Sequence, residues 1–391
     1  MKPILRFTNF DNDWEEIELL KIASEISYGM NAASKEYDGK NKYIRITDID
    51  EQTNKYIHKN IVSPDGNLEE KFLVKENDIL FARTGASTGK TYLYDKNDGK
   101  LYYAGFLIKA NIINHNANFI FQQTKLNKYN SWVKIMSMRS GQPGINSQEY
   151  GSYKFSITNP EEENKVSNFL SLLDKKIELQ SKKIEDLKLF KKGLLILRFS
   201  NKVKNIKLEE IIKKGKAGGT PKSTVQKYYD GTIPFLSISD ISSQNKYIKH
   251  TEKCISEEGL KNSSTWLVPK NSIILSMYAS YGLPCINKIE LATSQAMYSM
   301  IFKDDIDVEF IYYYLYYLQQ INYYDRLVST GTQSNLNAEK VNEIKIYCPN
   351  YDIQKNISKL FVSCDRKILL EENKLLKLQE LKKGLMQSMF V

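Results

Sequence analysis

The segment VSNFLSLLDKKIELQSKKIEDLKLFKKGL at residues 166–194 returns 191 positions later as ISKLFVSCDRKILLEENKLLKLQELKKGL at residues 357–385. Each segment belongs to a longer, strongly charged stretch that begins just after a proline, Pro160 or Pro349. Neither stretch contains another proline, and glycine is absent from both until near their ends. This composition predicts two long helices.

In both predicted helices the apolar residues recur in alternating steps of four and three, the spacing of a coiled-coil seam. The seam is narrow, and polar residues interrupt it at matched places, Gln180 with Glu371 and Lys191 with Lys382. A helix that packs only on its own domain usually needs a wider apolar stripe. We therefore expect the two helices to pair, although spacing alone allows either orientation. The seam residues are Leu170, Leu173, Ile177, Gln180, Ile184 and Leu187 in the first helix, and Phe361, Ile368, Glu371, Leu375 and Leu378 in the second.

The repeat extends beyond the helices. Tyr37-Asp38-Gly39 returns as Tyr229-Asp230-Gly231, and Asn54-Lys55-Tyr56-Ile57 returns as Asn245-Lys246-Tyr247-Ile248. Between such landmarks the copies differ, and each holds short apolar runs bounded by turn residues, which predict strands. Examples are the runs at 43–46, 79–82 and 102–109. We expect an α+β protein with two tandem, β-rich α/β domains at 1–160 and 197–349, each followed by a helix, at 161–196 and 350–391.

Composition narrows the possible partners. The chain of 391 residues has a net charge of +10 and a pI near 9.0, which favours a nucleic-acid partner. An AT-rich genome that enriches lysine is the alternative explanation. No apolar run is long enough to span a membrane, and no apolar signal segment begins the chain. The four cysteines form no C-x-x-C, so we expect a cytoplasmic protein without a disulfide or a metal site.

The chain offers no convincing catalytic constellation. Residues 85–91 (GASTGKT) resemble a phosphate-binding loop, but the spacing is one residue short and the following sequence predicts a strand. We interpret this segment as a hairpin that carries Arg83, Thr84, Ser87 and Lys90. Residues 137–142 of the first copy and 328–335 of the second are glycine-containing polar loops at equal places. Arginine suits guanine and glutamine suits adenine, although such loops are also ordinary turns.

The second copy contains Gly218-Gly219-Thr220-Pro221-Lys222, then residues 228–235 (YYDGTIPF) and Ile238-x-Asp240-Ile241. Together with the repeated helix, these motifs resemble the specificity subunits of type I restriction–modification systems. The resemblance covers nearly the whole chain. Two departures stand out, because the first copy has Ser27-Tyr28-Gly29-Met30 in place of the Gly-x-Thr-Pro turn, and the second has Met277-Tyr278 in place of Arg83-Thr84.

The resemblance implies a non-enzymatic subunit without a cofactor of its own. Each domain would read one half of a bipartite, asymmetric site in double-stranded DNA. The helices would pair antiparallel, set the half-site spacing and dock two modification subunits, with restriction subunits as further partners. The expected DNA-binding residues are Arg83, Thr84, Ser87, Lys90, Arg139, Ser140 and Gln142 in the first copy, and Thr220, Lys222, Tyr278, Ser280, Thr332, Gln333 and Ser334 in the second. A coiled-coil scaffold, a hidden methyltransferase or nuclease, and the recognition part of a fused type II-like restriction enzyme are the alternatives.

Overall fold

The computed structural model describes residues 1–138, 142–200, 202–204, 206–278, 280–328 and 335–391. The chain forms two compact units. Unit 1 combines residues 1–180 with 374–391, and unit 2 comprises residues 181–373. Each unit therefore contains one globular domain together with a part of each long helix.

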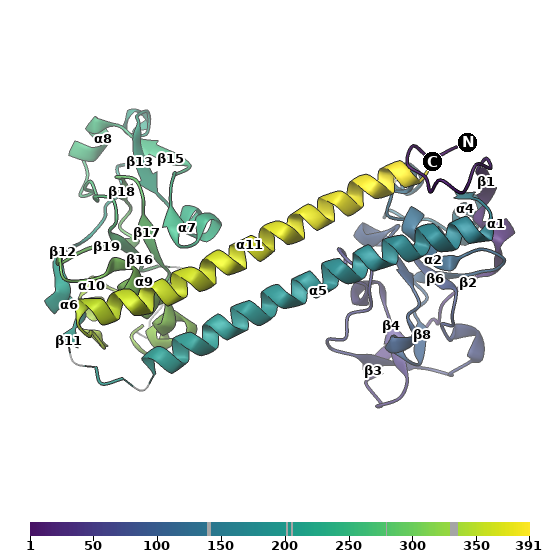
Figure 1. Cartoon of the computed structure of the whole chain (residues 1–391), viewed down its shortest axis with the longest axis horizontal. Helices are drawn as coiled ribbons and strands as arrows, with labels where there is room; N and C mark the ends of the chain where they lie inside the picture. The colour runs from purple at the N-terminus through teal and green to yellow at the C-terminus, as the bar shows by residue number, and fades with distance from the viewer. Residues whose placement is uncertain (139–141, 201, 205, 279, 329–334) are drawn as a thin grey trace. The chain divides into compact units, whose positions relative to one another are not determined.

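The two long helices are α5, Pro160–Phe199, and α11, Tyr351–Met389 (Figure 1). Pro160 occupies the first helical position, where its missing N–H is not needed, and three glutamates fill the first turn of α5, where the helix dipole favours negative charge. The predicted long helices are confirmed. Helix α5 continues past the repeated seam because Leu195 and Phe199 are buried in the core of unit 2.

Within each unit the segments of α5 and α11 run antiparallel. In unit 1, Val166 and Leu170 lie in one apolar core with Met386 and Met389. In unit 2, positions later on α5 meet positions earlier on α11, with ion pairs between Lys183 and Glu371 and between Lys191 and Asp365. The expectation of an antiparallel coiled coil is thus confirmed.

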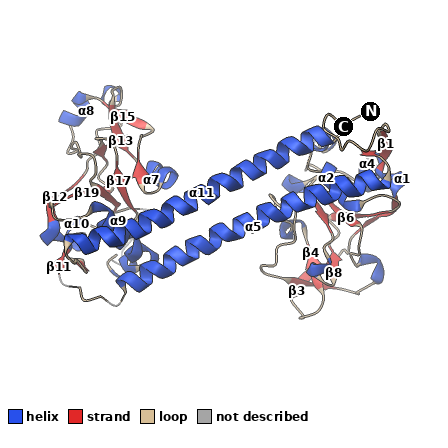
Figure 2. Ribbon diagram, in the orientation of Figure 1, coloured by secondary structure: helices blue, strands red, loops and turns tan. Residues whose placement is uncertain are grey.

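The globular domain of unit 1 is built around a four-stranded sheet in the order β2-β9-β6-β7, with three two-stranded ribbons beside it. Figure 2 shows strands only in the globular domains and none along the two long helices. The strands are β1 Glu15–Glu18, β2 Ala23–Tyr28, β3 Ala33–Glu36, β4 Lys42–Ile44, β5 Val62–Asp65, β6 Asp78–Ala82, β7 Thr91–Leu93, β8 Leu101–Tyr103, β9 Leu107–Ile112 and β10 Lys154–Ile157. The short α-helices are α1 Leu19–Ile22, α2 Ala117–Gln123, α3 Asn127–Met136 and α4 Ser147–Ser152.

The globular domain of unit 2 has a five-stranded sheet in the order β12-β19-β16-β17-β14 and a three-stranded sheet in the order β15-β13-β18. The strands are β11 Ile206–Lys207, β12 Ile212–Ala217, β13 Ile233–Leu236, β14 Tyr247–Ile248, β15 Lys253–Ile255, β16 Ile273–Ser276, β17 Pro284–Asn287, β18 Ala292–Thr293, β19 Met297–Phe302 and β20 Lys345–Ile346. The short α-helices are α6 Leu208–Ile211, α7 Ile238–Gln244, α8 Glu257–Lys261, α9 Val308–Gln320 and α10 Ala338–Asn342.

The sequence repeat is also a structural repeat. The order β2-β9-β6-β7 matches β12-β19-β16-β17, and backbone hydrogen bonds recur with it. The Arg83 N–H donates to the Phe106 carbonyl at 3.0 Å, and the Met277 N–H donates to the Ala296 carbonyl at 2.7 Å. The expected α+β fold with two tandem β-rich domains is confirmed.

Two predictions about local structure have clear outcomes. Strands β6 and β7 are antiparallel, with Phe81 opposite Thr91, so the phosphate-loop-like segment lies in a hairpin as predicted. The apolar run from Tyr102 to Lys109 belongs to two strands and not to one. Strand β8 pairs in parallel with β4, whereas β9 enters the four-stranded sheet between β2 and β6.

Candidate nucleic-acid interface

The sheet of unit 1 brings three loops to one edge. Strand β2 ends at Tyr28, opposite Ile108, and β6 ends at Ala82, opposite Leu107, which begins β9. The residues that follow β2 and β6 and those that precede β9 must therefore lie close together. Polar side chains at strand ends are a common way for a rigid sheet to present a binding surface.

The two predicted loops of the first copy contact each other. The Gly85 N–H donates to the Pro143 carbonyl at 3.0 Å, and Thr84 forms an isolated bridge with Gly144. The Ile145 N–H donates to the Arg83 carbonyl at 2.9 Å. The segments around 83–88 and 142–145 therefore make one continuous surface, although their separation in sequence gave no sign of this contact.

The predicted residues of the first copy have different surroundings. The guanidinium of Arg83 stacks on the Tyr28 ring, with Cζ 4.7 Å from the ring centroid. Gln142 is exposed beside Gly85, while Thr84 and Ser87 are half-buried. Lys90 turns toward the chain itself, since its Nζ donates to the Ile49 carbonyl at 3.1 Å and its side chain is 12% exposed. Arg139 and Ser140 lie outside the described residues.

The second copy presents the same edge of its sheet with other side chains. Strand β12 ends at Ala217 and β16 at Ser276, on both sides of the start of β19. The Leu336 N–H donates to the Met277 carbonyl at 3.0 Å, as Ile145 does to Arg83. The predicted residues Thr220, Lys222, Tyr278 and Ser280 are all exposed at or after these strand ends. Thr332, Gln333 and Ser334 lie outside the described residues.

The glycine turn of the second copy has a counterpart in the first. The Gly218 N–H donates to the Met297 carbonyl at 3.1 Å, and the Gly29 N–H donates to the Leu107 carbonyl at 3.2 Å. A Cβ on Gly218 would lie 2.1 Å from the Thr293 carbonyl oxygen, and one on Gly29 would lie 2.3 Å from that of Ala104. Both turns thus need glycine for close backbone approach, despite their different sequences.

Two residues of the first-copy surface were missing from the sequence prediction. Tyr28 supplies the ring under Arg83, and Phe106 is 62% exposed directly before β9. The pKa of Tyr28 is lowered, because the hydrogen bond from Ser147 and the charge of Arg83 outweigh the raising effect of burial. Tyr28 could have been noticed as an aromatic residue directly before the required glycine. Its contact with Arg83 depends on sheet register, which the sequence does not give.

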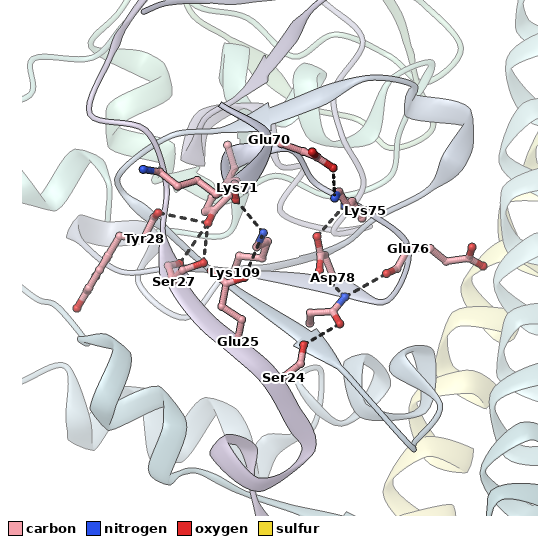
Figure 3. Close-up of polar contacts among 12 residues, drawn as sticks. Ser24, Glu25, Ser27, Tyr28, Glu70, Lys71, Lys75, Glu76, Asp78 and Lys109 are labelled. Atoms are coloured by element: carbon pink, nitrogen blue, oxygen red, sulfur yellow. Dashed lines mark hydrogen bonds and ion pairs between the residues drawn. The ribbon is translucent and has the colours of Figure 1, made fainter. Parts of the chain in front are cut away.

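A polar network holds the strands behind this surface (Figure 3). The Tyr103 hydroxyl donates to the Tyr28 carbonyl at 3.3 Å, and the Lys109 Nζ donates to the Lys71 carbonyl at 2.9 Å. On β6, burial raises the pKa of the Asp78 carboxyl, which accepts a hydrogen bond from Asn111 at 2.8 Å. These contacts join β2 to β8, β9 to the segment at Lys71, and β6 to β9. Figure 3 shows the Tyr28 side chain pointing away from the network.

The predicted seam of the helices is covered along its whole length. Its members are buried at Leu170, Ile184, Phe361, Ile368 and Glu371, and half-buried at Leu173, Ile177, Gln180, Leu187, Leu375 and Leu378. The matched lysines of the seam form ion pairs. Lys191 and Lys382 each reach an aspartate of the other helix at 2.5 Å, Asp365 in unit 2 and Asp174 in unit 1.

The helices also expose apolar side chains at matched positions. Leu179 and Leu370 are 58% and 52% exposed, and Phe190 and Leu381 are 59% and 52% exposed. On each helix the two positions are 11 residues apart, close to three whole turns, so they share a face. Three residues after Phe190 and Leu381 come Gly193 and Gly384, where an added Cβ would have no neighbour within 4 Å. The repeat therefore preserves exposed apolar residues at the same two positions of both helices.

In the described part of the chain, no group of three or more His, Cys, Asp or Glu side chains could hold a metal ion. No helix there combines the length and the apolar character needed to cross a bilayer. None of the cysteines in the described residues forms a disulfide, and burial raises the pKa of the Cys285 thiol.

Solved structures share this fold. A chain from a study of complex assembly and conformational transition of the type I R-M system aligns with a TM-score of 0.61 at 14% identity, covering 95% of this chain and 96% of that one. The S subunit of a type I restriction–modification system from M. genitalium aligns with a TM-score of 0.59 at 18% identity, covering 100% of this chain and 99% of that one.

Sequence comparison points the same way. The HindI specificity subunit of Haemophilus influenzae is 24% identical over 95% of this chain and 98% of that protein. The MjaIX specificity subunit of Methanocaldococcus jannaschii is 30% identical over 143 residues, a match that spans 36% of this chain and only 33% of that protein. The family model for the type I restriction modification DNA specificity domain matches twice, at residues 12–189 and 200–380. The chain therefore belongs to the family of type I restriction–modification DNA specificity proteins, with two such domains in tandem.

Proposed function

We propose that this chain gives a type I restriction–modification complex its sequence specificity, with the domain of unit 1 reading one half of a bipartite, asymmetric DNA site and the domain of unit 2 reading the other. The observation that carries the proposal is the pair of equivalent sheet edges with unlike side chains. The same backbone hydrogen bonds frame both edges, but Arg83 and Phe106 stand in one where Met277 and Ala296 stand in the other. Two domains with the same backbone arrangement and different side chains suit a DNA site with two different halves.

The reading residues are proposed from the loops at these edges. In the first domain they are Arg83, Thr84, Ser87 and Gln142, with Lys90 in a supporting role because its ammonium already binds the Ile49 carbonyl. In the second they are Thr220, Lys222, Tyr278 and Ser280, which are exposed. Arg139, Ser140, Thr332, Gln333 and Ser334 remain proposals from sequence. The net charge of +10 would favour DNA binding through phosphate contacts at both edges.

The helices are proposed to set half-site spacing and to dock two modification subunits. A helix of 40 residues is on the order of 60 Å long, which is comparable with one to two turns of DNA. The repeated exposed pairs support docking of one kind of partner twice, Leu179 with Leu381 in unit 1 and Leu370 with Phe190 in unit 2. Glycine inside a helix costs about 1 kcal/mol relative to alanine, and no neighbour within this chain explains Gly193 or Gly384. A partner backbone that approaches closely would explain both.

Co-expression with the modification subunits in a methylation-free host tests the recognition role. We expect genome-wide mapping of methylated adenines to give one bipartite asymmetric motif that disappears when this chain is omitted. Exchange of residues 1–160 for the equivalent domain of another specificity subunit should change only one half of the motif. A motif that is unaffected by omission of the chain would contradict the proposal.

Co-purification with the modification subunit tests the docking face. Replacing both Leu179 and Leu381 with Ser should remove one of two bound subunits, and replacing Leu370 and Phe190 as well should remove both. Leu189→Ser is the matched control, because Leu189 is 69% exposed but its counterpart is Glu380, so the repeat does not preserve it. Equal loss of binding in the control would mean that general stickiness, and not this face, holds the partner.

A further inference from the structure

Arg83 is held in a fixed position at the strand-end surface of unit 1, and few of its N–H donors are bonded within the described residues. Its backbone is fixed in both directions, since its N–H donates to the Phe106 carbonyl and its carbonyl accepts from the Ile145 N–H. One face of the guanidinium lies on the Tyr28 ring, and Nη1 makes a long contact of 3.5 Å with the Gly105 carbonyl. Arg83 forms no ion pair with any acidic side chain in the described ranges. Most of its five N–H donors therefore remain available to a ligand.

Tyr28 is itself held at both ends, so it can fix the arginine. Its hydroxyl accepts a hydrogen bond from the Ser147 N–H at 3.1 Å, which ties the ring to the start of α4. Its backbone carbonyl accepts from the Tyr103 hydroxyl at 3.3 Å, within the network drawn in Figure 3. Its place opposite Ile108 on β9 fixes the register. A planar cation on a fixed ring loses little further freedom when it binds.

The neighbours of Arg83 favour a base edge over a phosphate as its ligand. Phe106, whose carbonyl accepts the Arg83 N–H, is 62% exposed and offers an apolar contact of the kind that suits a thymine methyl group. Gln142 is exposed, and its amide lies beside Gly85. Among the described residues the neighbours are thus an amide and an apolar ring, which suit base recognition, whereas a phosphate site would gather further cations. Lys90, the nearest lysine along the chain, is bound to Ile49 and Glu51.

We propose that Arg83 reads a guanine in the half-site of the first domain through its guanidinium fork, and that Tyr28 is the positioning residue that aims it. This inference rests on the proposed function and adds to it the base and the supporting residue. A guanidinium fork matches the O6 and N7 acceptors that guanine presents in the major groove. The second domain has no arginine at the equivalent place, because Met277 stands there and is only 4% exposed.

The test uses the whole complex of this chain with its modification subunits, expressed in a methylation-free host. Arg83→Lys keeps the charge but removes the fork. The preference for guanine at one position of one half-site should then fall roughly 5- to 150-fold, which is the discrimination that one bidentate pair provides. Tyr28→Leu should relax the same position to a smaller degree. Tyr28→Phe keeps the ring and should preserve most of the preference for guanine. If Tyr28 acted only through its hydroxyl, this variant would lose the preference instead.

Each outcome has a separate meaning. An unchanged motif for Arg83→Lys, or an equal loss at every position, would overturn the inference, because the residue would then be silent or would contact only phosphate. A wild-type motif without guanine in either half would overturn it while leaving the proposed function intact. A wild-type complex without any bipartite motif would overturn both. Hydrogen exchange of β2 and β6 in each variant separates a lost contact from a lost fold, and Met277→Leu in the second domain should leave both half-sites unchanged.

Discussion

In unit 1 Asp174 of α5 pairs with Lys382 of α11, and in unit 2 Asp365 of α11 pairs with Lys191 of α5, each at 2.5 Å. A helix of the adjoining domain supplies the next contact in both units. From α2 the Gln122 amide lies 3.3 Å from Asp174, and from the equivalent place on α9 the Tyr313 hydroxyl donates to Asp365 at 2.5 Å. These two places, which we call the helix junctions, therefore bring together side chains at equivalent positions. The hydrogen bond from the domain helix to the aspartate is shorter in unit 2.

The two junctions differ more at the position three residues after Gln122 and Tyr313. Unit 1 has Lys125 there, and burial, followed by the positive charge of Lys382, lowers the pKa of Lys125 to about 8. Unit 2 has Tyr316, whose ring lies 5.0 Å from the ammonium of Lys191. One junction thus places a cation near a cation, and the other places a cation on an aromatic ring. The repeat fixes where side chains meet, while the interaction between them is free to diverge.

The largest expected difference comes from removing the aspartates. Asp365→Asn should destabilise unit 2 by about 3 kcal/mol, because Lys191 and the buried Lys246 would lose the carboxylate that lies 2.5 Å and 3.8 Å from them. Asp174→Asn should destabilise unit 1 by only about 1 kcal/mol, since Asp174 is 37% exposed and its amide contact is long. Hydrogen exchange of α9 and α2 measures the two effects separately. Equal losses would show that the tyrosine and Lys246 add nothing to the second junction.

Exchanging the side chains of Lys125 and Tyr316 should transfer the difference in stability between the two junctions. Lys125→Tyr gives unit 1 the residue found in unit 2, so it removes a buried like charge and offers Lys382 a ring. We expect a gain of about 1 to 2 kcal/mol at pH 7. Tyr316→Lys is the reciprocal control and should destabilise unit 2. Loss of stability in both variants would mean that the surroundings of each site, and not the pair alone, decide which side chain fits.

The pH dependence should separate the units as well. The folded-state pKa of Lys125 lies below its unfolded value, so the unfolded chain binds more protons above pH 8 and folding becomes more favourable as pH rises. From pH 7 to 9 this group should add about 1 kcal/mol to the stability of unit 1. Urea unfolding followed at unit 1 measures the slope. Lys125→Tyr should flatten it, and a slope that persists in this variant would assign the effect to another group.

The smallest effect is expected where the copies match most closely in the seam. Replacing Gln180 and Glu371 together with Leu should leave stability within about 1 kcal/mol, because apolar seam residues replace a polar position and the ion pair of Glu371 with Lys183. The register of the helices should loosen, since polar seam residues specify register more than they stabilise it. Methylome mapping would then show tolerance of altered half-site spacing. An unchanged spacing requirement would argue against a spacer role for this pair.

Periodicity predicted the helices and their seam because heptad spacing depends only on local sequence. Orientation did not follow from it. Lys191 and Lys382 were recognisable as matched interruptions, but their aspartate partners lie outside the seam pattern, and only three-dimensional pairing reveals them. Helix α5 ends at Phe199, beyond the predicted residue 196, because Leu195 and Phe199 are held by the core of a domain and not by the seam.

The surface at the strand ends of unit 1 was predictable in part. Arg83 and Gln142 were chosen for their chemistry and do lie on one surface, yet their proximity arises from the backbone hydrogen bond between Gly85 and Pro143. Tyr28 was overlooked because its contact with Arg83 depends on the register of β2 against β9. Lys90 was chosen for its charge, but the fold turns that charge toward the Ile49 carbonyl. Long-range pairing of this kind cannot be read from a single sequence.

Three residues near position 390 complete the core of the first domain. Phe390 packs against Trp14 and Phe119, with ring centroids 6.0 Å and 5.2 Å apart, and Met386 and Met389 belong to the same core. During synthesis, the N-terminal domain therefore emerges from the ribosome long before its final packing partners exist. At roughly 5 to 20 residues per second, it waits tens of seconds without the Phe390 ring that packs on Trp14. A chain truncated before Met386 should consequently leave the core of the first domain incomplete.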